Sequence, residues 1–387
     1  MATLKIVGDS GQSLDVGSQG APAISTTTEN ANAFLINVPG GALTALFRDS
    51  SGPQRPALSM MYRIADANAG QRYASTTNGM GAQTISQLSK GGSSGMYENT
   101  IAAMNAAKTA EIAAGGTVLI DPFHFIQGEQ DQVGGTAFGT YKSRVLQYRT
   151  DLSNDTNGGI PIPFIMSQTA TWAYYGTEAR IGLAQLDLAR TLPDVYALAQ
   201  YQLPYASDGL HMTRVGYYRL GELHARIHNA VTSGLGWKPF APKTRVLNPS
   251  SIVLKFDVPS GSLAFDTTVV AAQPNYGFSL SGTAATITSV TITASDEITI
   301  GISQPITEPG SAVGYGVKYG TGPGLGNLRD SETAVSKYDN APLANWALHF
   351  SDDLGIPQPE ATKLWVTSDK YLIGPSGALY QLSTQAA

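Results

Sequence analysis

The stretch that decides the fold lies near the start of the chain, where residues 4–17 read LKIVGDSGQSLDVG. Its first four residues, Leu4 to Val7, form an apolar run that is typical of a buried β-strand. Glycine and serine follow at once, which indicates a turn. In an open parallel sheet the loops at the carboxyl ends of the strands build the functional site. A serine in this turn is therefore a candidate nucleophile if a base reaches it. The alternative is an ordinary Gly/Ser turn.

Outward from this stretch, short apolar runs alternate with helical patterns as far as residue 236. The pattern predicts further strands at 117–126, 160–166 and 194–203. It predicts helices at 97–114, 140–152, 177–192 and 213–231. Strands that alternate with helices indicate a parallel sheet with helices on both faces. We therefore expect an α/β domain of three layers, α/β/α, over residues 1–236.

The composition changes after Trp237. Residues 238–242 read KPFAP, which is typical of a linker. Short β-rich runs follow at 251–258, 267–272, 286–293 and 297–303, each bounded by turn-forming residues. This spacing favours a smaller β-rich, sandwich-like domain over residues 243–387. Its Gly-rich part, at 310–345, could pack back on the catalytic face.

Composition excludes several classes of function. The chain has 387 residues, of which 42% are hydrophobic and 14% are charged, which is enough apolar material for a large core. Its 24 Lys and Arg against 29 Asp and Glu give 24 − 29, a net charge of −5, so we expect no nucleic-acid partner. It has no cysteine, which excludes disulfides and thiolate chemistry. No apolar run is long enough to cross a membrane, so we expect no membrane partner.

The first eight residues carry one lysine and a very short apolar stretch. They predict no signal peptide, and we expect a protein that is cytoplasmic when made.

A possible base lies just after the last predicted strand of the sheet, in Ser207-Asp208-Gly209-Leu210-His211. Asp208 and His211 are three residues apart, so their side chains can hydrogen-bond across one turn. The carboxylate would fix the imidazole tautomer and stabilise the imidazolium. The imidazole would then accept a serine proton as general base. The alternative is an Asp that caps a helix beside a surface His.

Two more segments carry glycine and side-chain amides at predicted loops. They are residues 78–85, which read NGMGAQTI, and residues 125–131, which read FIQGEQD. Glycine permits close backbone approach and amides donate hydrogen bonds, and acyl transfer needs both near the developing oxyanion. Taken singly, each segment is also compatible with an ordinary turn.

Together these four segments resemble the SGNH hydrolase superfamily, and within it the carbohydrate O-acetylesterase branch of sialate acetylesterase-like and acetylxylan esterase-like proteins. Gly11-Gln12-Ser13 is similar to the nucleophile box of that branch. Leu14-Asp15 departs from its usual Asn-Met, although Gly17 returns at the expected place. The Gln-Gly-Glu-x-Asp box matches 127–131, and the Asp-x-x-His box matches 208–211. The resemblance covers residues 4–232 and implies a flavodoxin-like fold.

The resemblance implies a role for each matching residue. Ser13 would be the nucleophile, His211 the base and Asp208 the residue that orients it. The oxyanion hole would comprise the N–H groups of Ser13 and Gly81 and the side chain of Gln127. Glu129 would steady the loop behind the site.

Three alternatives to these assignments stay open. Gly79 competes with Gly81 for the glycine position. The general superfamily box places Gln130 rather than Gln127 in the oxyanion hole. Ser10 lies in a Gly-Asp-Ser triplet that also resembles a superfamily box, but we prefer Ser13 because its box belongs to the same branch as residues 127–131.

The function that the resemblance implies is a serine esterase that removes O-acetyl groups from a glycan without a metal or cofactor. One alternative is a non-catalytic phage virion component that binds glycan, which would place the protein in a virion or outside cells and includes assembly into an oligomer. Another is a short-chain lipase-like esterase. The alternatives predict different results with acetyl esters and with longer acyl chains.

Some residues suggest other sites. His224 and His228 are four apart on a predicted helix, as in some zinc sites, but we favour a solvated helix face. His124 lies in a predicted strand and is expected to be a core residue. In the C-terminal part, the pair Arg329-Asp330 is expected to be a solvated ion pair. The aromatic residues Tyr315, Tyr319 and Trp346 could stack on sugar rings, although core packing is as plausible.

Overall fold

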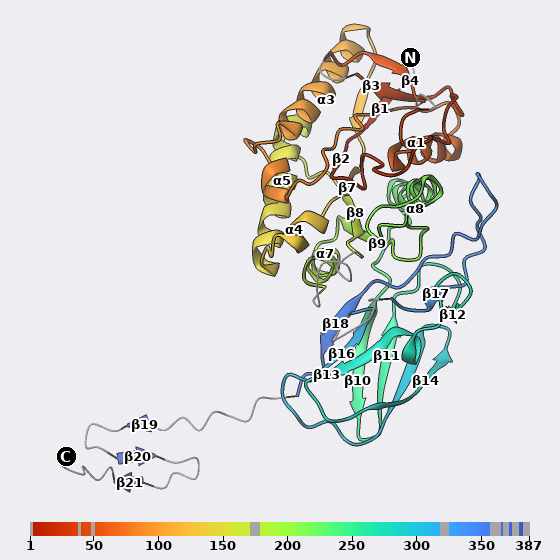
Figure 1. The fold of residues 1–387 in the computed structure, drawn as a ribbon. Coiled ribbons are helices and arrows are strands. Elements are labelled where there is room, and N and C mark those ends of the chain that lie inside the picture. Colours follow the sequence, from red (N-terminus) through yellow and green to blue (C-terminus); the bar gives the residue numbers. More distant parts are fainter. Residues whose placement is uncertain are drawn as a thin grey trace.

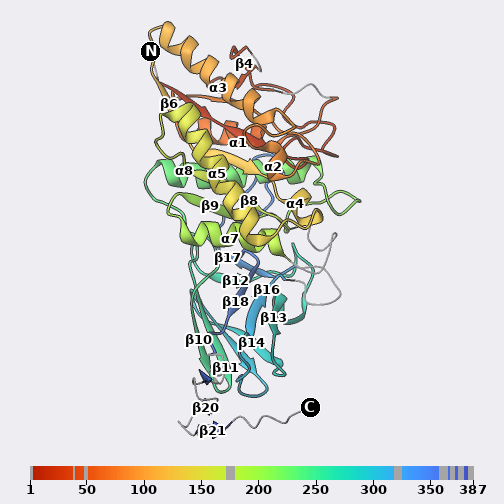
Figure 2. The same cartoon turned by 90° about the vertical axis from the view of Figure 1, so that its left-hand side faces the viewer.

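The computed structural model describes residues 3–37, 40–47, 51–170, 179–317 and 325–356, together with three short strands, Trp365–Val366, Tyr371–Ile373 and Leu379–Gln381. Seen in Figure 1, the N-terminal part is a central sheet between two layers of helices, and a β-rich part lies below it. Figure 2 shows the helices of one layer crossing the strands of the sheet. The three-layer α/β/α architecture expected from the sequence is confirmed.

The central sheet is parallel apart from its edge strand. Its strands are β1 (Leu4–Val7), β2 (Asp9–Gly11), β3 (Ala33–Ile36), β4 (Leu43–Ala45), β5 (Arg72–Ser75), β6 (Val118–Ile120), β7 (Phe123–Ile126), β8 (Phe164–Gln168) and β9 (Val195–Ala199). The sheet consists of two ladders, β4-β3-β5-β1-β6 and β2-β7-β8-β9. They are continuous because β1 runs into β2 across Gly8 and β6 runs into β7 across residues 121–122. Five strand positions thus follow the flavodoxin-like order 2-1-3-4-5, with β3 and β4 added at one edge.

Strand order reverses between β2 and β7, which are parallel neighbours with Gly11 opposite Ile126. Open α/β sheets bind their ligands at such a switch point, in the crevice beyond the carboxyl ends of the strands. The turn that holds Ser13 follows β2, and residues 127–131 follow β7. The topology therefore brings two of the four predicted segments to the position where a site is expected.

The helices are α1 (Pro56–Ala67), α2 (Ile85–Leu88), α3 (Met96–Ala113), α4 (Glu129–Val133), α5 (Phe138–Asn157), α7 (Arg180–Thr191) and α8 (Arg214–Thr232). Figure 1 shows α3 and α5 on one side of the sheet and α1 and α8 on the other. The side chains of Phe123, Phe125 and Tyr148 fill the α3/α5 side, with Phe123 stacked on Phe164 at 5.2 Å between ring centroids. This aromatic packing holds β7 and β8, whose ends carry site residues.

Sequence patterns located most of these elements but not all. The single strand expected at 117–126 is two strands, because Pro122 has no N–H for a ladder and Asp121 ends the first. Helix α1, which the patterns missed, begins with Pro56 at its first turn, a usual start signal.

The β-rich part contains two antiparallel sheets that share one core. Their strands are β10 (Pro242–Asn248), β11 (Ser251–Phe256), β14 (Ile287–Ala294) and β15 (Glu297–Ile302) in one sheet, and β13 (Phe278–Ser281), β16 (Ala312–Tyr315) and β18 (Phe350–Asp353) in the other. A two-stranded ladder joins β12 (Leu263–Phe265) to β17 (Leu328–Asp330), and a short 3-10 helix covers Pro274–Gly277. Phe256 and Phe350 meet between the sheets, with 6.2 Å between ring centroids.

The strand expected at 267–272 is wrong. Asp266 Oδ1 accepts hydrogen bonds from the backbone N–H groups of Thr268 and Val269 and from the Thr268 hydroxyl. This local capping folds the start of the segment into a turn, and β-branched composition alone does not reveal it. The neighbouring strand is β12, at residues 263–265.

The expected linker does not separate the two parts. Phe240 and Ala241 are buried in the core of the β-rich part, and the same core includes Ala197 and Ala199 from β9. The Tyr201 hydroxyl lies 2.9 Å from that of Tyr315 and donates to the Ala347 carbonyl. One continuous apolar core therefore joins the central sheet to the β-rich part.

A segment of the β-rich part, residues 331–345, reaches up along α8 (Figure 1). Arg226 of α8 donates to the Leu343 carbonyl and to Asn345 Oδ1. Glu222 Oε1 accepts from the backbone N–H of Lys337 at 2.8 Å. We call residues 331–345 the strap.

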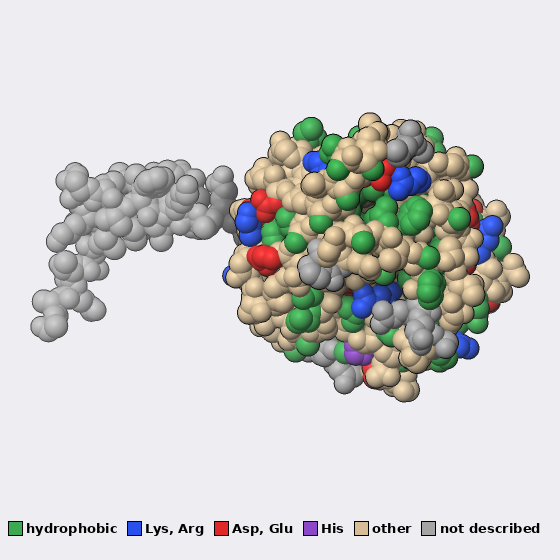
Figure 3. All heavy atoms as spheres, turned by 90° about the horizontal axis from the view of Figure 1, so that it is seen from above, with side chains coloured by type: hydrophobic (Ala, Val, Ile, Leu, Met, Phe, Trp, Pro, Cys, Tyr) green, Lys and Arg blue, Asp and Glu red, His purple; other side chains and the backbone are tan. Residues whose placement is uncertain are grey.

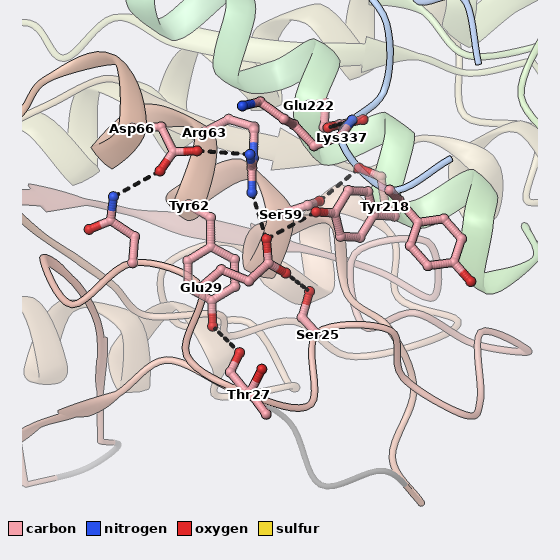
Figure 4. A network of polar contacts seen from close by, with 12 residues as sticks. Ser25, Thr27, Glu29, Ser59, Tyr62, Arg63, Asp66, Tyr218, Glu222 and Lys337 are labelled. Carbon is pink, nitrogen blue, oxygen red and sulfur yellow. Dashed lines mark hydrogen bonds and ion pairs between the residues drawn. The ribbon is translucent and has the colours of Figure 1, made fainter. Parts of the chain in front are cut away.

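Behind the strap, a polar network ties α8 to α1 and to an N-terminal loop (Figure 4). Glu29, in this loop, forms an ion pair with Arg63 of α1 and accepts a hydrogen bond from the Tyr218 hydroxyl of α8. Ser59 of α1 donates to the Tyr218 carbonyl at 2.7 Å. These contacts fix α8, whose N-terminus follows His211.

Candidate active site

The nucleophile candidate Ser13 lies in a tight turn directly after β2. The Gln12 N–H donates to the Ile126 carbonyl, and the Gln12 carbonyl accepts from the N–H groups of Asp15 and Val16. Two glycines are required here. A Cβ on Gly11 would lie 2.2 Å from the Ile126 carbonyl oxygen, and Gly17 combines a φ of +77° with a Cβ position 2.1 Å from the Gln54 carbonyl oxygen. The Ser13 side chain is partly exposed at this turn.

The competing serine, Ser10, lies within β2 and is fully buried. Its register partner on β7 is Phe125, whose ring is buried against Tyr148, at 5.0 Å between centroids. A substrate cannot reach this position without opening the core. The geometry therefore favours Ser13 over Ser10.

The loop with the oxyanion candidates runs beside β2. The Asn78 N–H donates to the Asp9 carbonyl and the Met80 N–H donates to the Gly11 carbonyl. A Cβ placed on Gly81 would lie 3.8 Å from the Cβ of Ser13, whereas a Cβ on Gly79 would lie 2.1 Å from Oδ2 of Asp15. Gly81 thus faces the nucleophile candidate, and Gly79 makes room for Asp15.

Asp208 and His211 form a hydrogen-bonded pair. His211 Nδ1 lies 2.7 Å from Asp208 Oδ2, and Asp208 Oδ1 accepts from the backbone N–H groups of Leu210 and His211. Partial burial raises the pKa of the Asp208 carboxyl, but the hydrogen bonds from His211 and Leu210 outweigh it, so the pKa is lowered. A carboxylate on Nδ1 leaves Nε2 free to act as a base.

Shared contacts tie the Ser13 turn to the start of α8. The Tyr217 hydroxyl donates to the Ser18 carbonyl at 2.7 Å and accepts from the Met212 N–H at 3.3 Å. Leu14 and Met212, the neighbours of Ser13 and His211, belong to one buried apolar cluster. No hydrogen bond joins Ser13 to His211 in this structure, and such bonds commonly tighten only when substrate is bound. Their direct contact stays a prediction.

Glu129 fastens the turn from behind. Its Oε2 accepts from Gln12 Nε2 at 2.8 Å and its Oε1 accepts from Gln200 Nε2 at 3.1 Å. Gln12 Oε1 in turn accepts from the Gln130 N–H. Burial raises the pKa of Glu129 from 4.5 to about 7. The contacts are those of a residue that steadies the turn, as the resemblance implied.

The structure does not support Gln127 as an oxyanion donor. Its side chain is buried, and its Nε2 donates both to Asp131 Oδ2 and to the Gln83 carbonyl. Its Oε1 accepts from the Tyr141 hydroxyl. Since Asp131 also accepts from the Ile85 N–H, Gln127 holds the 78–85 loop in place rather than facing substrate. The alternative, Gln130, is partly exposed and lies next to Gln12.

The expectation of a solvated face for His224 and His228 is wrong. Both are buried and extend a hydrogen-bonded chain with His124, which is the buried core residue expected from the sequence. His124 Nδ1 lies 2.9 Å from His224 Nδ1, and His124 Nε2 lies 3.1 Å from His228 Nδ1. Ser167 closes one end against His224 and Asp121 the other against His228. Within the described residues no group of three His, Asp or Glu side chains is arranged to hold a metal ion.

Two C-terminal expectations also need correction. Asp330 is buried and accepts from the backbone and side chain of Asn345, while Arg329 donates to Asp266, so Arg329-Asp330 is not a solvated pair. Tyr315 and Trp346 are buried in the β-rich core and cannot stack on a sugar. Tyr319 lies outside the described residues.

Sequence reasoning missed Gln200 and Tyr217, which link the site segments. Neither lies in a recognisable motif, and only the fold brings Gln200 to Glu129. On the face seen in Figure 3, charged side chains are sparse and of both signs, with no continuous basic patch. No helix in the described ranges is long and apolar enough to span a membrane.

Comparison with known proteins agrees with this geometry. Residues 58–229 match the model of a family described as carbohydrate esterase, sialic acid-specific acetylesterase. A carbohydrate acetylesterase from Xanthomonas citri has a similar structure, with 16% identity and a TM-score of 0.58 over 90% of this chain and 80% of that one. A protein from Arabidopsis thaliana has 18% identity and a TM-score of 0.50 over 58% of this chain and 98% of that one. Comparison with curated protein sequences gives no match.

The fold and the comparisons define an SGNH-type α/β domain with β-rich sheets added after it. The resemblance to the sialate acetylesterase-like carbohydrate esterases is confirmed by the family match over residues 58–229. This match supports an esterase. It does not include the turn that carries Ser13, so the choice of nucleophile depends on the geometry described above.

Proposed function

We propose that this protein is a serine esterase that removes O-acetyl groups from a carbohydrate through an acetyl-enzyme intermediate. The observation that carries the proposal is the position of Gly81 against Ser13 at the switch point of the sheet. The Asp208–His211 pair supplies an oriented base on a loop tied to the same turn. The family match supports the choice of ester.

In the first half-reaction, the Ser13 hydroxyl attacks the acetyl carbonyl carbon while His211 Nε2 takes its proton. The carbonyl oxygen becomes an oxyanion, which accepts hydrogen bonds from the N–H groups of Ser13 and Gly81. We assign the third donor to the side chain of Gln130, since the N–H groups of Gln127 are engaged elsewhere. The intermediate then collapses, the C–O bond to the sugar breaks, and His211 returns the proton to the departing sugar oxygen.

In the second half-reaction, water replaces the sugar. His211 takes a proton from the water, and the resulting hydroxide attacks the acetyl carbon of the ester on Ser13. Collapse releases acetate, and the proton passes from His211 back to Ser13. Asp208 keeps the imidazole in one tautomer and stabilises its charged form in both halves. An acidic chain suits a neutral acetylated glycan better than a strongly anionic one.

The test is hydrolysis of p-nitrophenyl acetate by the wild type and two serine variants. We expect Ser13→Ala to lower kcat by at least ~10³-fold, because the nucleophile is lost. Ser10→Ala is the matched control and should stay within about threefold of the wild type, since Ser10 is buried in β2. Equal activity of Ser13→Ala and the wild type would exclude Ser13 as nucleophile.

Substrate class needs a second measurement. Acetate release from acetylated polysaccharides identifies a carbohydrate substrate, and a series of p-nitrophenyl esters of increasing length measures acyl preference. We expect the rate to be highest with acetyl. A maximum at long chains would favour the lipase-like alternative, and a wild type inactive on every ester would favour the non-catalytic glycan-binding one.

A further inference from the structure

Two buried carboxyls that the proposed mechanism does not use lie beneath the nucleophile turn. Asp9 belongs to β2 and Asp15 follows Ser13 by two residues, and each is only 1% exposed. Their carboxyl groups are within hydrogen-bonding reach of each other. In this sequence Asp15 is also part of the departure from the nucleophile box of the resembling esterases.

Neither carboxyl has another donor. In the described part of the chain, no N–H or O–H group donates to any of the four carboxyl oxygens of Asp9 and Asp15. Two buried carboxylates without donors repel each other and lose their hydration, which is strongly unfavourable. One proton between them converts the repulsion into a charge-assisted O–H···O hydrogen bond. Burial is the largest cause that raises the pKa of both groups, and the charge of Asp15 raises that of Asp9 further.

The groups around the pair can balance one negative charge but not two. Arg55, at the start of α1, is the one cation whose charge lowers the pKa of both acids, and its guanidinium is also bonded to the Thr77 carbonyl. Tyr148 of α5 and Tyr217 of α8 face the pair as neutral phenols, and their pKa values are raised. On β7 the register neighbour of Asp9 is His124, whose pKa burial lowers, so it stays neutral.

The pair lies where it can set the position of the nucleophile. Asp15 Oδ2 would be 2.1 Å from a Cβ on Gly79, so its carboxyl rests directly on the loop that carries Gly81. The same loop is bonded to the Asp9 carbonyl through the Asn78 N–H. Asp15 is also bonded through its N–H to Gln12, next to Ser13. Any movement that separates Asp15 from Asp9 therefore changes the distance between Ser13 and Gly81.

We propose that Asp9 and Asp15 share one proton and act as a positioning pair that holds the Ser13 turn against the Gly79–Gly81 loop. Loss of this proton at alkaline pH separates the two carboxylates and displaces the nucleophile from its oxyanion donors. The catalytic part of this inference rests on the proposed esterase function, whereas the shared proton does not.

Activity tests the positioning role through the Asp15→Asn and Asp15→Ala variants. An Asn amide donates to the Asp9 carboxylate and so replaces the shared proton with one that does not titrate. We expect kcat of the wild type on p-nitrophenyl acetate to fall reversibly at alkaline pH with little change in KM. Asp15→Ala should lose activity at every pH, and Asp15→Asn should restore most of it and remove the alkaline fall.

Glu222→Gln, a buried carboxyl of α8 bonded to the strap, is the matched control and should keep the wild-type pH profile. An alkaline fall in Asp15→Asn like that of the wild type would overturn the proposal. So would equal activity of the Ala and Asn variants at neutral pH.

Two measurements detect the proton without activity. In the Glu129→Gln background, which removes the other buried acid near the turn, infrared spectra should show a protonated carboxyl band at neutral pH that Asp9→Asn abolishes. A raised folded pKa stabilises the fold below the unfolded pKa, and this contribution is lost as pH rises through the folded value. The free energy of unfolding should therefore fall with rising pH less steeply in Asp15→Asn. An inactive protein with these signals would refute only the esterase function, and an active one without them would refute the shared proton.

Discussion

The α-carbon of Gly81 faces the nucleophile candidate so closely that an added methyl group would stand 3.8 Å from the Cβ of Ser13. That separation is an ordinary van der Waals contact, so Gly81→Ala should fold normally. The methyl would nevertheless occupy space that the acetyl oxygen needs. We expect kcat/KM on p-nitrophenyl acetate to fall about 10²-fold, with an unchanged melting temperature. Gly79→Ala, whose methyl would clash with Asp15, should instead lower the melting temperature.

Asp208→Asn tests the orientation of the base. An amide can present its N–H to His211 Nδ1 and so stabilise the wrong tautomer, with the proton on Nε2. We expect kcat to fall by about 10²–10⁴-fold while binding of substrate is kept. Circular dichroism should show an unchanged fold, because the side chain is partly exposed. A variant with wild-type kcat would show that Asp208 does not orient the base.

Glu129→Gln should change the pH dependence of stability. The pKa of Glu129 is about 7 in the folded state and 4.5 ordinarily, so the folded protein binds more protons and loses stability as pH rises through 7. The shift corresponds to a contribution on the order of 3 kcal/mol, which the variant should no longer lose between acidic and alkaline pH. Gln200 can accept from the new amide, because its Oε1 has no other partner in the described residues. Urea unfolding from pH 4 to pH 8 measures the slope.

The buried histidine chain should make the protein sensitive to acid. Burial lowers the pKa of His224 to about 3 and that of His124 well below its usual value. Between the ordinary value of 6.5 and these values, the unfolded chain binds protons that the folded chain does not, so stability falls as pH falls. His224→Gln should reduce this slope, measured as melting temperature against pH, and an unchanged slope would contradict the assignment.

Gly221 is where α8 crosses α1, and its replacement should affect stability alone. A Cβ there would lie 2.1 Å from the Pro56 carbonyl oxygen and 2.2 Å from the Ser59 hydroxyl. Gly221→Ala must push the helices apart and should cost about 1–3 kcal/mol or more. Gly139→Ala, in α5 with no atom within 4 Å of the new methyl, should instead stabilise by about 0.5–1 kcal/mol. Chemical denaturation of the two variants provides the comparison.

The sequence was informative where chemistry and local pattern coincide. Periodicity located the strand before Ser13 and the helix after His211, and strand–helix alternation was sufficient for the α/β architecture. It could not decide between Gln127 and Gln130, because the choice depends on Asp131 and the Gln83 carbonyl, which only the fold brings to the Gln127 amide. For the same reason the helix spacing of His224 and His228 could not reveal His124 between them and the sheet.

The Gln168 side chain makes two hydrogen bonds with the backbone of His349, one to its carbonyl and one from its N–H. Gln168 ends β8 and His349 precedes β18, so the amide joins the two sheets much as an extra rung would. Cutting the gene at the apparent boundary near residue 237 would strip this rung and lay bare Ala199 and Tyr201. A truncated hydrolase should therefore be poorly soluble, and the two portions are better treated as a single unit of expression, crystallisation and inheritance.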